Sequence, residues 1–385
     1  MIGWAAMHER ADPVIDALGR RGNLPAETST FLGRDEDLAE VGRLLRDEPL
    51  VTLTGVAGVG KTRLALKAAG ELPGGAWLVE LSGERNGALL AHTIGSAIGL
   101  PEQAARPQGD VLAEHLADRR MLLILDTCEH LLRPCRDLVG QILRAAPGVR
   151  VLVTSRQPLG LPGERVHTVR PLPVTAEDCD AVRLFRDRAL AVRPGFECSD
   201  DAVLRLCRRL DGVPLALELA AGRLRALTAR ELLDHMDDRF SLLSGRGRTG
   251  RHRTLRTAVG WSHELCTPEE RLLWARLSVF AGTFDADAAA DVCADERLRG
   301  VPDLVSRLAD KSVLIRHGQR FRMLGMMRDY GREWLREIGE ERLVAGRHRH
   351  HSLALRRVMR HPRRRACGDP GRRPESGRPH PGPGH

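Results

Sequence analysis

The chain has 385 residues, enough for two or three domains with separate hydrophobic cores. No apolar run approaches the roughly 18 residues of a membrane span, and the first residues lack a secretory signal pattern, so we expect a cytoplasmic protein. Of the net charge of +9, the segment 356–385 carries +7, so the nearly neutral remainder does not indicate nucleic-acid binding. The eight cysteines form no C-x-x-C pair, which favours reduced and mostly buried thiols.

The first part of the chain alternates strand and helix patterns. Residues 1–29 are interpreted as a leader, and a helix is expected from about residue 31 to Arg46. Buried-strand patterns follow at 50–54, 76–81, 121–126 and 150–154, separated by helical patterns near 87–99, 109–118 and 136–145. This alternation predicts a three-layer α/β domain over residues 30–172, with a parallel sheet covered by helices on both faces.

The remaining elements are mostly helical. Patterns at 181–192, 200–210, 214–227 and 229–236 predict an all-helical lid subdomain over 173–245, which ends in a Gly/Arg-rich loop at 245–250. In a third unit over 246–340, predicted helices at 254–264, 268–279, 285–293 and 301–309 precede strands at 311–316 and 320–324 and a helix near 326–338. Thr267, Pro268 and Glu270 form a strong helix-start signal. Helices followed by a hairpin favour a winged helix.

The last segment, 341–385, is interpreted as a helix end followed by a basic tail. After Leu355 the composition changes to Arg, Pro, Gly and His, which cannot bury a core. Two origins stay open for this tail, a disordered extension and the product of a reading-frame shift in a GC-rich gene. His348, His350 and His351 have no carboxylate or cysteine partner at helical spacing, so they favour a solvated helix face over a metal site.

The most specific motif follows the first predicted strand. The pattern G-x-x-x-x-G-K-[ST] runs from Gly55 to Thr62, between that strand and a predicted helix. Its glycines let backbone N–H groups turn towards phosphates, and the helix N-terminus adds positive potential. Lys61 is expected to reach the β- and γ-phosphates of ATP or ADP. The predicted nucleotide-binding residues of this run are Gly55, Val56, Ala57, Gly58, Val59, Gly60, Lys61, Thr62 and Arg63.

A second motif ends the apolar strand 121–126 in a carboxylate. Parallel strands end at the same sheet edge, so Asp126 and the hydroxyl of Thr62 are expected to hold Mg²⁺. Thr127 follows Asp126 where fast ATPases often place a second carboxylate, which predicts slow hydrolysis. Glu129 is the nearest group that could orient a water for catalysis; the alternative is an acid favoured by a helix N-terminus.

Two further segments have weaker signals. Arg156 follows the strand at 150–154, and a guanidinium there could distinguish ATP from ADP by pairing with the γ-phosphate. The alternative for Arg156 is a solvated arginine. Pro214 opens an apolar helix after Gly212, which by itself indicates only a helix start.

In order, these segments resemble the STAND class of signal-transduction ATPases, in particular the NB-ARC-like modules of AfsR-type and LuxR-type actinobacterial regulators. The resemblance covers about residues 25–352. The segments that resemble the family are 23–25 with 31–34, 55–62, 125–131, 154–156 with 158–160, 212–216, and 261–262 with 277–282. It implies that Gly33 and Arg34 lie against the base, that Pro214 packs near the adenine, and that the winged helix closes over the nucleotide. Thr127 stands where asparagine is usual in this family.

The function implied by this resemblance is an ADP/ATP-dependent switch with slow hydrolysis in a transcriptional or signalling regulator. ADP is expected to favour a closed state and Mg²⁺-ATP an open one. Family members continue into helical-repeat sensors, so this chain is expected to be truncated. We expect partner proteins or self-association on activation, and neither a membrane nor direct DNA contact.

Two alternatives remain from the sequence. Residues 250–325 could bind DNA, although the helix at 303–310 has one arginine and two aspartates. A small-molecule kinase could use the same phosphate loop, although no acceptor-side base is evident.

Overall fold

The computed structural model describes residues 22–27, 29–70, 75–100, 106–234, 236 and 255–360. Most of the predicted leader, the loop at 245–250 and the tail after 360 lie outside the described residues. The described cysteines are all free thiols, buried except for the partly exposed Cys198. Within these ranges, no helix combines the length and hydrophobicity needed to cross a bilayer.

The centre of the first unit is a five-stranded parallel sheet in the order β2-β3-β4-β1-β5. Its strands are β1 (Leu50–Thr54), β2 (Ala76–Glu80), β3 (Met121–Asp126), β4 (Val149–Thr154) and β5 (Arg165–Thr168). The α/β fold class and the first four strands are therefore confirmed. β5 was not predicted, because its four residues are mostly exposed and lack the apolar run of the central strands.

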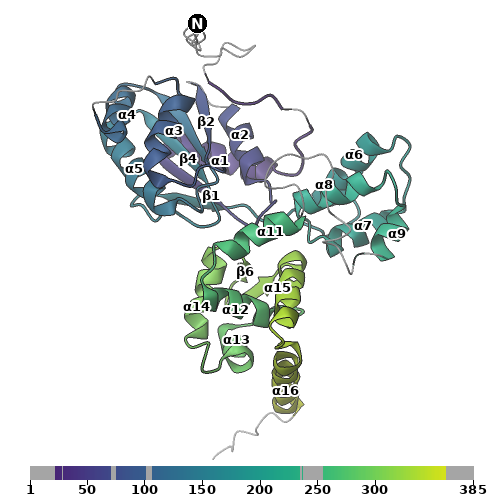
Figure 1. Ribbon diagram of the computed structural model, residues 1–385. Helices are drawn as coiled ribbons and strands as arrows, with labels where there is room; N and C mark the ends of the chain where they lie inside the picture. The colour runs from purple at the N-terminus through teal and green to yellow at the C-terminus, as the bar shows by residue number, and fades with distance from the viewer. Residues whose placement is uncertain are drawn as a thin grey trace, which may run out of the picture.

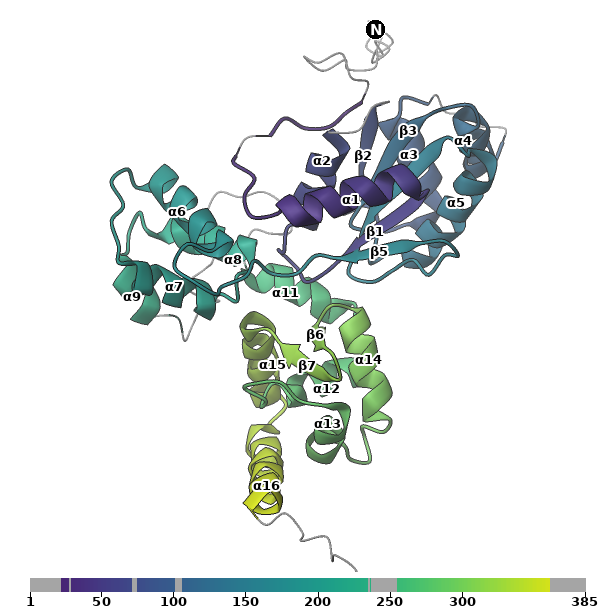
Figure 2. The ribbon, with the colours of Figure 1, turned by 180° about the vertical axis from the view of Figure 1, so that it is seen from behind.

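Helices cover both faces of the sheet (Figures 1 and 2). They are α1 (Asp35–Asp47), α2 (Lys61–Gly70), the 3₁₀ turn η1 (Gly87–Leu89), α3 (Leu90–Ala97), α4 (Gln108–Leu116) and α5 (Leu132–Ala145). Alternate residues of β1 separate the two cores: Leu53 packs with the α1 and α2 core, and Leu50 with the core of α3, α4 and α5. α5 starts four residues before the predicted position, because Pro134 is tolerated in its first turn.

A helical unit follows the sheet, with α6 (Asp180–Val192), α7 (Asp200–Arg209), α8 (Pro214–Arg223) and α9 (Ala229–Asp234). Its buried side chains continue the core on the α1 and α2 face of the sheet. The predicted helix at 214–227 ends earlier, because backbone bonds from Ala226 and Leu227 to the Arg223 carbonyl close a turn there. Figure 1 places this unit beside the sheet and α11 at the junction below it.

The third unit contains α11 (Leu255–Glu264), α12 (Pro268–Leu277), α13 (Ala286–Cys293), α14 (Val301–Asp310), the antiparallel hairpin of β6 (Leu314–His317) and β7 (Arg320–Met323), and α15 (Gly325–Glu337). The predicted capping box at Thr267 is present. β6 begins three residues later than expected. The reason is that Ser312, at φ +56°, turns the chain after α14, while Val313 N–H donates to the Leu308 carbonyl.

The helix α16 (Glu341–Arg360) extends the described chain beyond the third unit. It continues past residue 356, where the tail was expected to begin. The solvated-face interpretation of its histidines was wrong for two of them. The His348 ring packs 4.8 Å from the Phe280 ring, and His351 Nδ1 lies 3.2 Å from an Asp291 oxygen.

One histidine of the third unit is enclosed by aromatic rings. His263 is buried, with ring centroids of Trp334 at 4.6 Å, Tyr330 at 5.4 Å and Trp274 at 5.6 Å. Its Nε2 has no hydrogen-bond partner among the described residues. Burial, with a smaller contribution from the charge of Arg271, lowers the pKa of His263 from 6.5 to about 4.

This burial predicts a pH-dependent stability. As the pH falls below about 6.5, His263 takes up a proton in the unfolded chain but stays neutral in the folded protein until about pH 4. The free energy of unfolding is therefore highest above about pH 6.5 and falls as the pH decreases towards 4. We expect the free energy of unfolding to fall by about 2 kcal/mol between about pH 7.5 and pH 5 from this group alone. His263→Phe should reduce that loss in urea titrations, and the exposed His317→Phe should not. An identical pH dependence in both variants would contradict this assignment.

Candidate functional site

The phosphate loop, residues 55–62, connects β1 to α2 and depends on glycine for its shape. Gly55, Gly58 and Gly60 have φ values of +144°, +75° and +102°. A Cβ on Gly55 would lie 2.4 Å from the Val169 carbonyl oxygen, and one on Gly58 would lie 2.6 Å from Leu215 Cβ. Gly60 has open space around it, so its φ alone requires glycine. The loop is therefore packed between β5 and the helical unit.

Lys61 begins α2 and reaches back across the loop. Its Nζ donates to the carbonyl oxygens of Gly55 at 2.8 Å and Val56 at 3.1 Å. The ammonium thus lies inside the loop, at the N-terminal end of a helix, where the local potential favours anions. Val56, Ala57 and Val59 are buried, which fixes the backbone around it.

Three hydroxyl groups converge on the carboxylate of Asp126 at the end of β3. Thr62 Oγ1 and Thr154 Oγ1 each donate to Oδ1 at 2.6 Å, and Thr127 Oγ1 donates to Oδ2 at 3.0 Å. Asp126 is 5% exposed, so these bonds compensate the lost hydration of a buried acid. The structure thus brings Thr62 and Asp126 into direct contact. All donor atoms here are oxygens, the ligands that Mg²⁺ prefers, so the residues fit that ion.

Thr127 has a backbone conformation that its side chain disfavours. Its φ is +67°, in the left-handed region, where a β-branched residue is strained. Two contacts compensate: the backbone N–H donates to Thr154 Oγ1 at 2.9 Å, and the hydroxyl binds Asp126. The sequence analysis noted Thr127 because it stands where a carboxylate or an asparagine is expected, but it did not predict the strained backbone.

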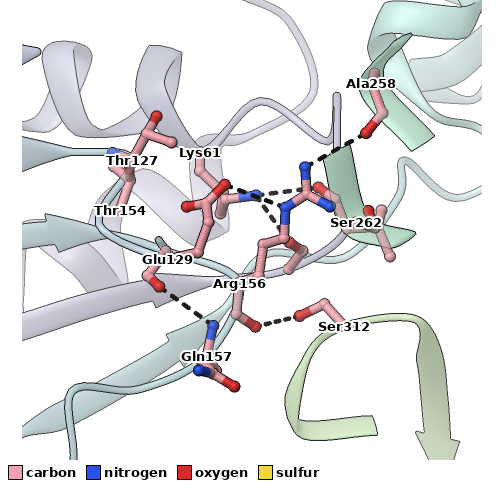
Figure 3. Close-up of polar contacts among 12 residues, drawn as sticks. Lys61, Thr127, Glu129, Thr154, Arg156, Gln157, Ala258, Ser262 and Ser312 are labelled. Carbon is pink, nitrogen blue, oxygen red and sulfur yellow. Dashed lines mark hydrogen bonds and ion pairs between the residues drawn. The ribbon is translucent and has the colours of Figure 1, made fainter. Parts of the chain in front are cut away.

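Glu129 and Arg156 form a buried ion pair (Figure 3). Arg156 Nε donates to Glu129 Oε1 at 3.1 Å, and their side chains are 5% and 6% exposed. Arg156 Nη2 also donates to the Ala258 carbonyl of α11 at 3.3 Å. The solvated alternative for Arg156 is therefore wrong. The two residues predicted to act separately on water and on the γ-phosphate contact each other.

The segments expected near the base also meet at the phosphate loop. Arg34 is buried; its Nη2 donates to the Val59 carbonyl at 2.9 Å and its Nη1 to Asp37 at 2.8 Å. Gly33, at φ +71°, approaches α6, where a Cβ would lie 2.4 Å from Asp180 Cβ. Pro214 is the first residue of α8, and the N–H of the next residue donates to the Gly58 carbonyl at 3.1 Å.

Arg63, the last residue of the predicted set, lies beside this group. Its Nη2 donates to the carbonyls of Ser29 and Thr30, and its guanidinium lies 5.8 Å from the Phe31 ring centroid. Arg63 therefore attaches the segment before α1 to the start of α2.

Sequence reasoning missed the residues that join the units around this site. Asp211 accepts from the Gly325 N–H at 2.6 Å and from Arg322 at 3.1 Å, which links the helical unit to the start of α15. His130 contacts Trp261 of α11 edge-on, with ring centroids 5.6 Å apart. Both contacts join residues more than 100 positions apart. The family resemblance included the segments 125–131 and 261–262, which hold His130 and Trp261, but nothing in the sequence indicated that these two side chains meet.

Comparisons with known proteins agree with this architecture. No protein-family model matches the chain. The "Uncharacterized protein Rv0894" of Mycobacterium tuberculosis is 40% identical over 348 residues, covering 86% of this chain and 88% of that protein. The "Putative HTH-type transcriptional regulator Rv0890c" of the same organism is 42% identical over 325 residues, covering 81% of this chain. The chain spans 36% of the length of that second relative.

A solved structure shows the same fold. The Walker-type ATPase Paby2304 of Pyrococcus abyssi has a TM-score of 0.54 and 16% sequence identity, covering 80% of this chain and 98% of that one. The fold of this chain is that of an α/β P-loop NTPase. By sequence, the chain belongs to the family of the mycobacterial protein Rv0894.

The strain at Thr127 generates a prediction. Asparagine tolerates the left-handed region and can still donate to Asp126, so Thr127→Asn should raise the free energy of unfolding by about 1 kcal/mol. Thr127→Val keeps the β-branch but removes the hydroxyl, and should lower it. Thermal unfolding of both variants beside the wild type measures the effect. A lower melting temperature for Thr127→Asn would refute the strain argument.

Proposed function

We propose that the chain is an ADP/ATP-dependent conformational switch of the NB-ARC-like STAND type, with slow ATP hydrolysis. The observation that carries this proposal is the 2.6 Å contact between Thr62 and Asp126 beside Lys61. An ammonium, a hydroxyl and a carboxylate therefore lie at one sheet edge, which supports a role in binding a Mg²⁺-nucleotide. Lys61 would hold the phosphates, while Thr62 and Asp126 would hold Mg²⁺.

The proposed site is enclosed by three parts of the chain. We assign residues 30–172 as the nucleotide-binding domain, 173–245 as the lid and 246–340 as a winged helix. The contacts from Leu215 to Gly58 and from Arg156 to Ala258 support this enclosure, because both neighbouring units bond to loops at the same edge. Gly33, Arg34 and Pro214 would bound the base, consistent with their positions around the phosphate loop.

The proposed output is regulation of transcription. One relative is named as an HTH-type transcriptional regulator, and this chain corresponds to 36% of it, so DNA binding by that protein is not transferred to this chain. Direct DNA reading by the third unit is disfavoured, because α14 carries Asp303 and Asp310 beside a single arginine. We therefore expect the switch to act through partner proteins or self-association.

Nucleotide retention tests the proposal. Gently purified protein should carry ADP, detectable by anion exchange after denaturation. Lys61→Ala should abolish that retention, because it removes the charge that faces the phosphates. Lys67→Ala is the matched control: it lies on the same helix, but its Nζ pairs with Glu27 at 3.1 Å. If Lys61→Ala protein retained as much ADP as Lys67→Ala, the proposed site would be wrong.

The hydrolysis rate provides a second test. With Thr127 after Asp126 and Glu129 paired to Arg156, turnover should lie far below the roughly 10 s⁻¹ of dedicated enzymes. Glu129→Gln should lower this slow rate by at least about tenfold if the carboxylate orients water. Glu84→Gln, in a neighbouring loop, serves as the control. Turnover of tens per second in the wild type, or an unchanged rate in Glu129→Gln, would contradict these roles.

A further inference from the structure

A cavity of about 480 Å³ lies where the ends of β1 and β5 face the third unit. Its opposite wall comes from the end of α14 and from the hairpin of β6 and β7. Figure 2 shows β5 above β6 and α14. The volume lies within the roughly 300–1,000 Å³ of small-molecule sites, which often form between domains.

This cavity differs from the proposed nucleotide site in its binding groups. Of the predicted nucleotide-binding residues, its described lining includes Gly55 and Val56 but neither Lys61 nor Thr62. The carbonyl oxygens of Gly55 and Val56 accept from the Lys61 ammonium at 2.8 and 3.1 Å. The start of the phosphate loop therefore borders both the cavity and that ammonium, and the cavity has room for a second ligand of its own.

Much of the cavity wall is apolar. Val166 of β5 lines it and is 45% exposed, although valine side chains are usually buried. Pro158, from the loop after β4, and Leu314 and Ile315 of β6 add further apolar surface. Removing such surface from water favours the binding of a ligand that has an apolar ring or chain.

Two arginines line the cavity from different units. Arg170 follows β5 and Arg316 lies on β6, and neither makes an ion pair or a hydrogen bond within the part of the chain that the structure describes. The Arg316 guanidinium lies 5.2 Å from the Phe321 ring centroid, a contact that orients it and leaves its in-plane N–H donors available. Asp310 also lines the cavity, so the lining has a net charge of +1, which favours a monoanion.

We propose that this cavity binds a small organic carboxylate with an apolar body; this inference goes beyond the proposed function and does not depend on it. The carboxylate pairs with Arg170 and Arg316, since guanidinium and carboxylate form two parallel hydrogen bonds. The ring or chain covers Val166 and the apolar residues of β6. Such a ligand contacts the first and third units at once, so by linkage its binding favours the arrangement in which the hairpin lies beside β5.

Equilibrium dialysis of the full chain against 2-naphthoate and, separately, decanoate tests this inference. One probe is rigid and the other flexible, and both are monoanions at neutral pH. At least one of them should bind saturably, with one site per chain. 2-Naphthamide, a neutral analogue of the same shape, should bind at least about tenfold more weakly than 2-naphthoate, because it lacks the charge that pairs with the arginines.

Substitutions locate the binding site. Arg170→Gln and Arg316→Gln should each weaken carboxylate binding by at least about fivefold, because each removes a charged donor. Val166→Trp should weaken it as well, since the larger ring fills the cavity, keeps both arginines and suits a strand. Arg165→Gln is the matched control: Arg165 is also exposed on β5, but it pairs with Glu48 at 2.8 Å and lies outside the described lining. It should bind like the wild type, and thermal unfolding verifies that each variant is folded.

Three results would overturn the site. They are no saturable binding of either carboxylate, equal binding of the amide, and a loss in Arg165→Gln as large as that in Arg170→Gln. The dialysis is repeated with saturating ADP and with Lys61→Ala, and carboxylate binding should not change in either case. Displacement by ADP would assign the cavity to the nucleotide site and refute the inference. If the chain binds the carboxylate but no ADP, this inference stands and the proposed function is wrong.

Discussion

The buried carboxylate of Asp126 is the constraint around which the site is organised. A charge that is 5% exposed must be compensated by polar contacts, and here hydroxyls from three segments provide them. One comes from α2 after the phosphate loop, one from the residue after β3 and one from the end of β4. The bonds therefore fix the positions of three connections at the carboxyl edge of the sheet, where parallel topology has already brought them together.

The neighbouring units attach to this edge through polar contacts with its loops. The helical unit bonds to the phosphate loop at Gly58, and α11 bonds to the pair formed by Glu129 and Arg156. A buried ion pair contributes little net stability, because the desolvation of both charges offsets their attraction. The pair instead constrains geometry, since removing either partner would leave a buried charge. The pair therefore constrains how the loops that carry Glu129 and Arg156 lie relative to each other and to α11.

The sequence was sufficient for the central strands and the phosphate loop, and insufficient for contacts between distant segments. Strands such as β3 are buried on both faces and show as apolar runs, whereas β5 has one strand neighbour and exposed residues such as Val166. The Thr62 and Asp126 contact was predictable because parallel strands end at one edge. The pairing of Glu129 with Arg156 was not, because both were assigned roles towards a ligand and no local pattern encodes a bond between two loops.

Backbone strain is concentrated at these same junctions. Among the described residues, the non-glycine residues with positive φ are Thr127, Asp211 and Ser312. Thr127 binds Asp126, Asp211 accepts from the first N–H of α15, and Ser312 donates to the Arg156 carbonyl. Left-handed conformations of this kind persist where surrounding contacts over-determine them. Asp211 and Ser312 lie where two units meet, and Thr127 lies at the carboxyl edge of the sheet beside Asp126. Breaking one of these contacts would therefore also release part of the backbone strain. Favourable contacts combined with strained backbones reduce the free-energy difference between this arrangement of the units and any alternative one, which is consistent with the proposed switch.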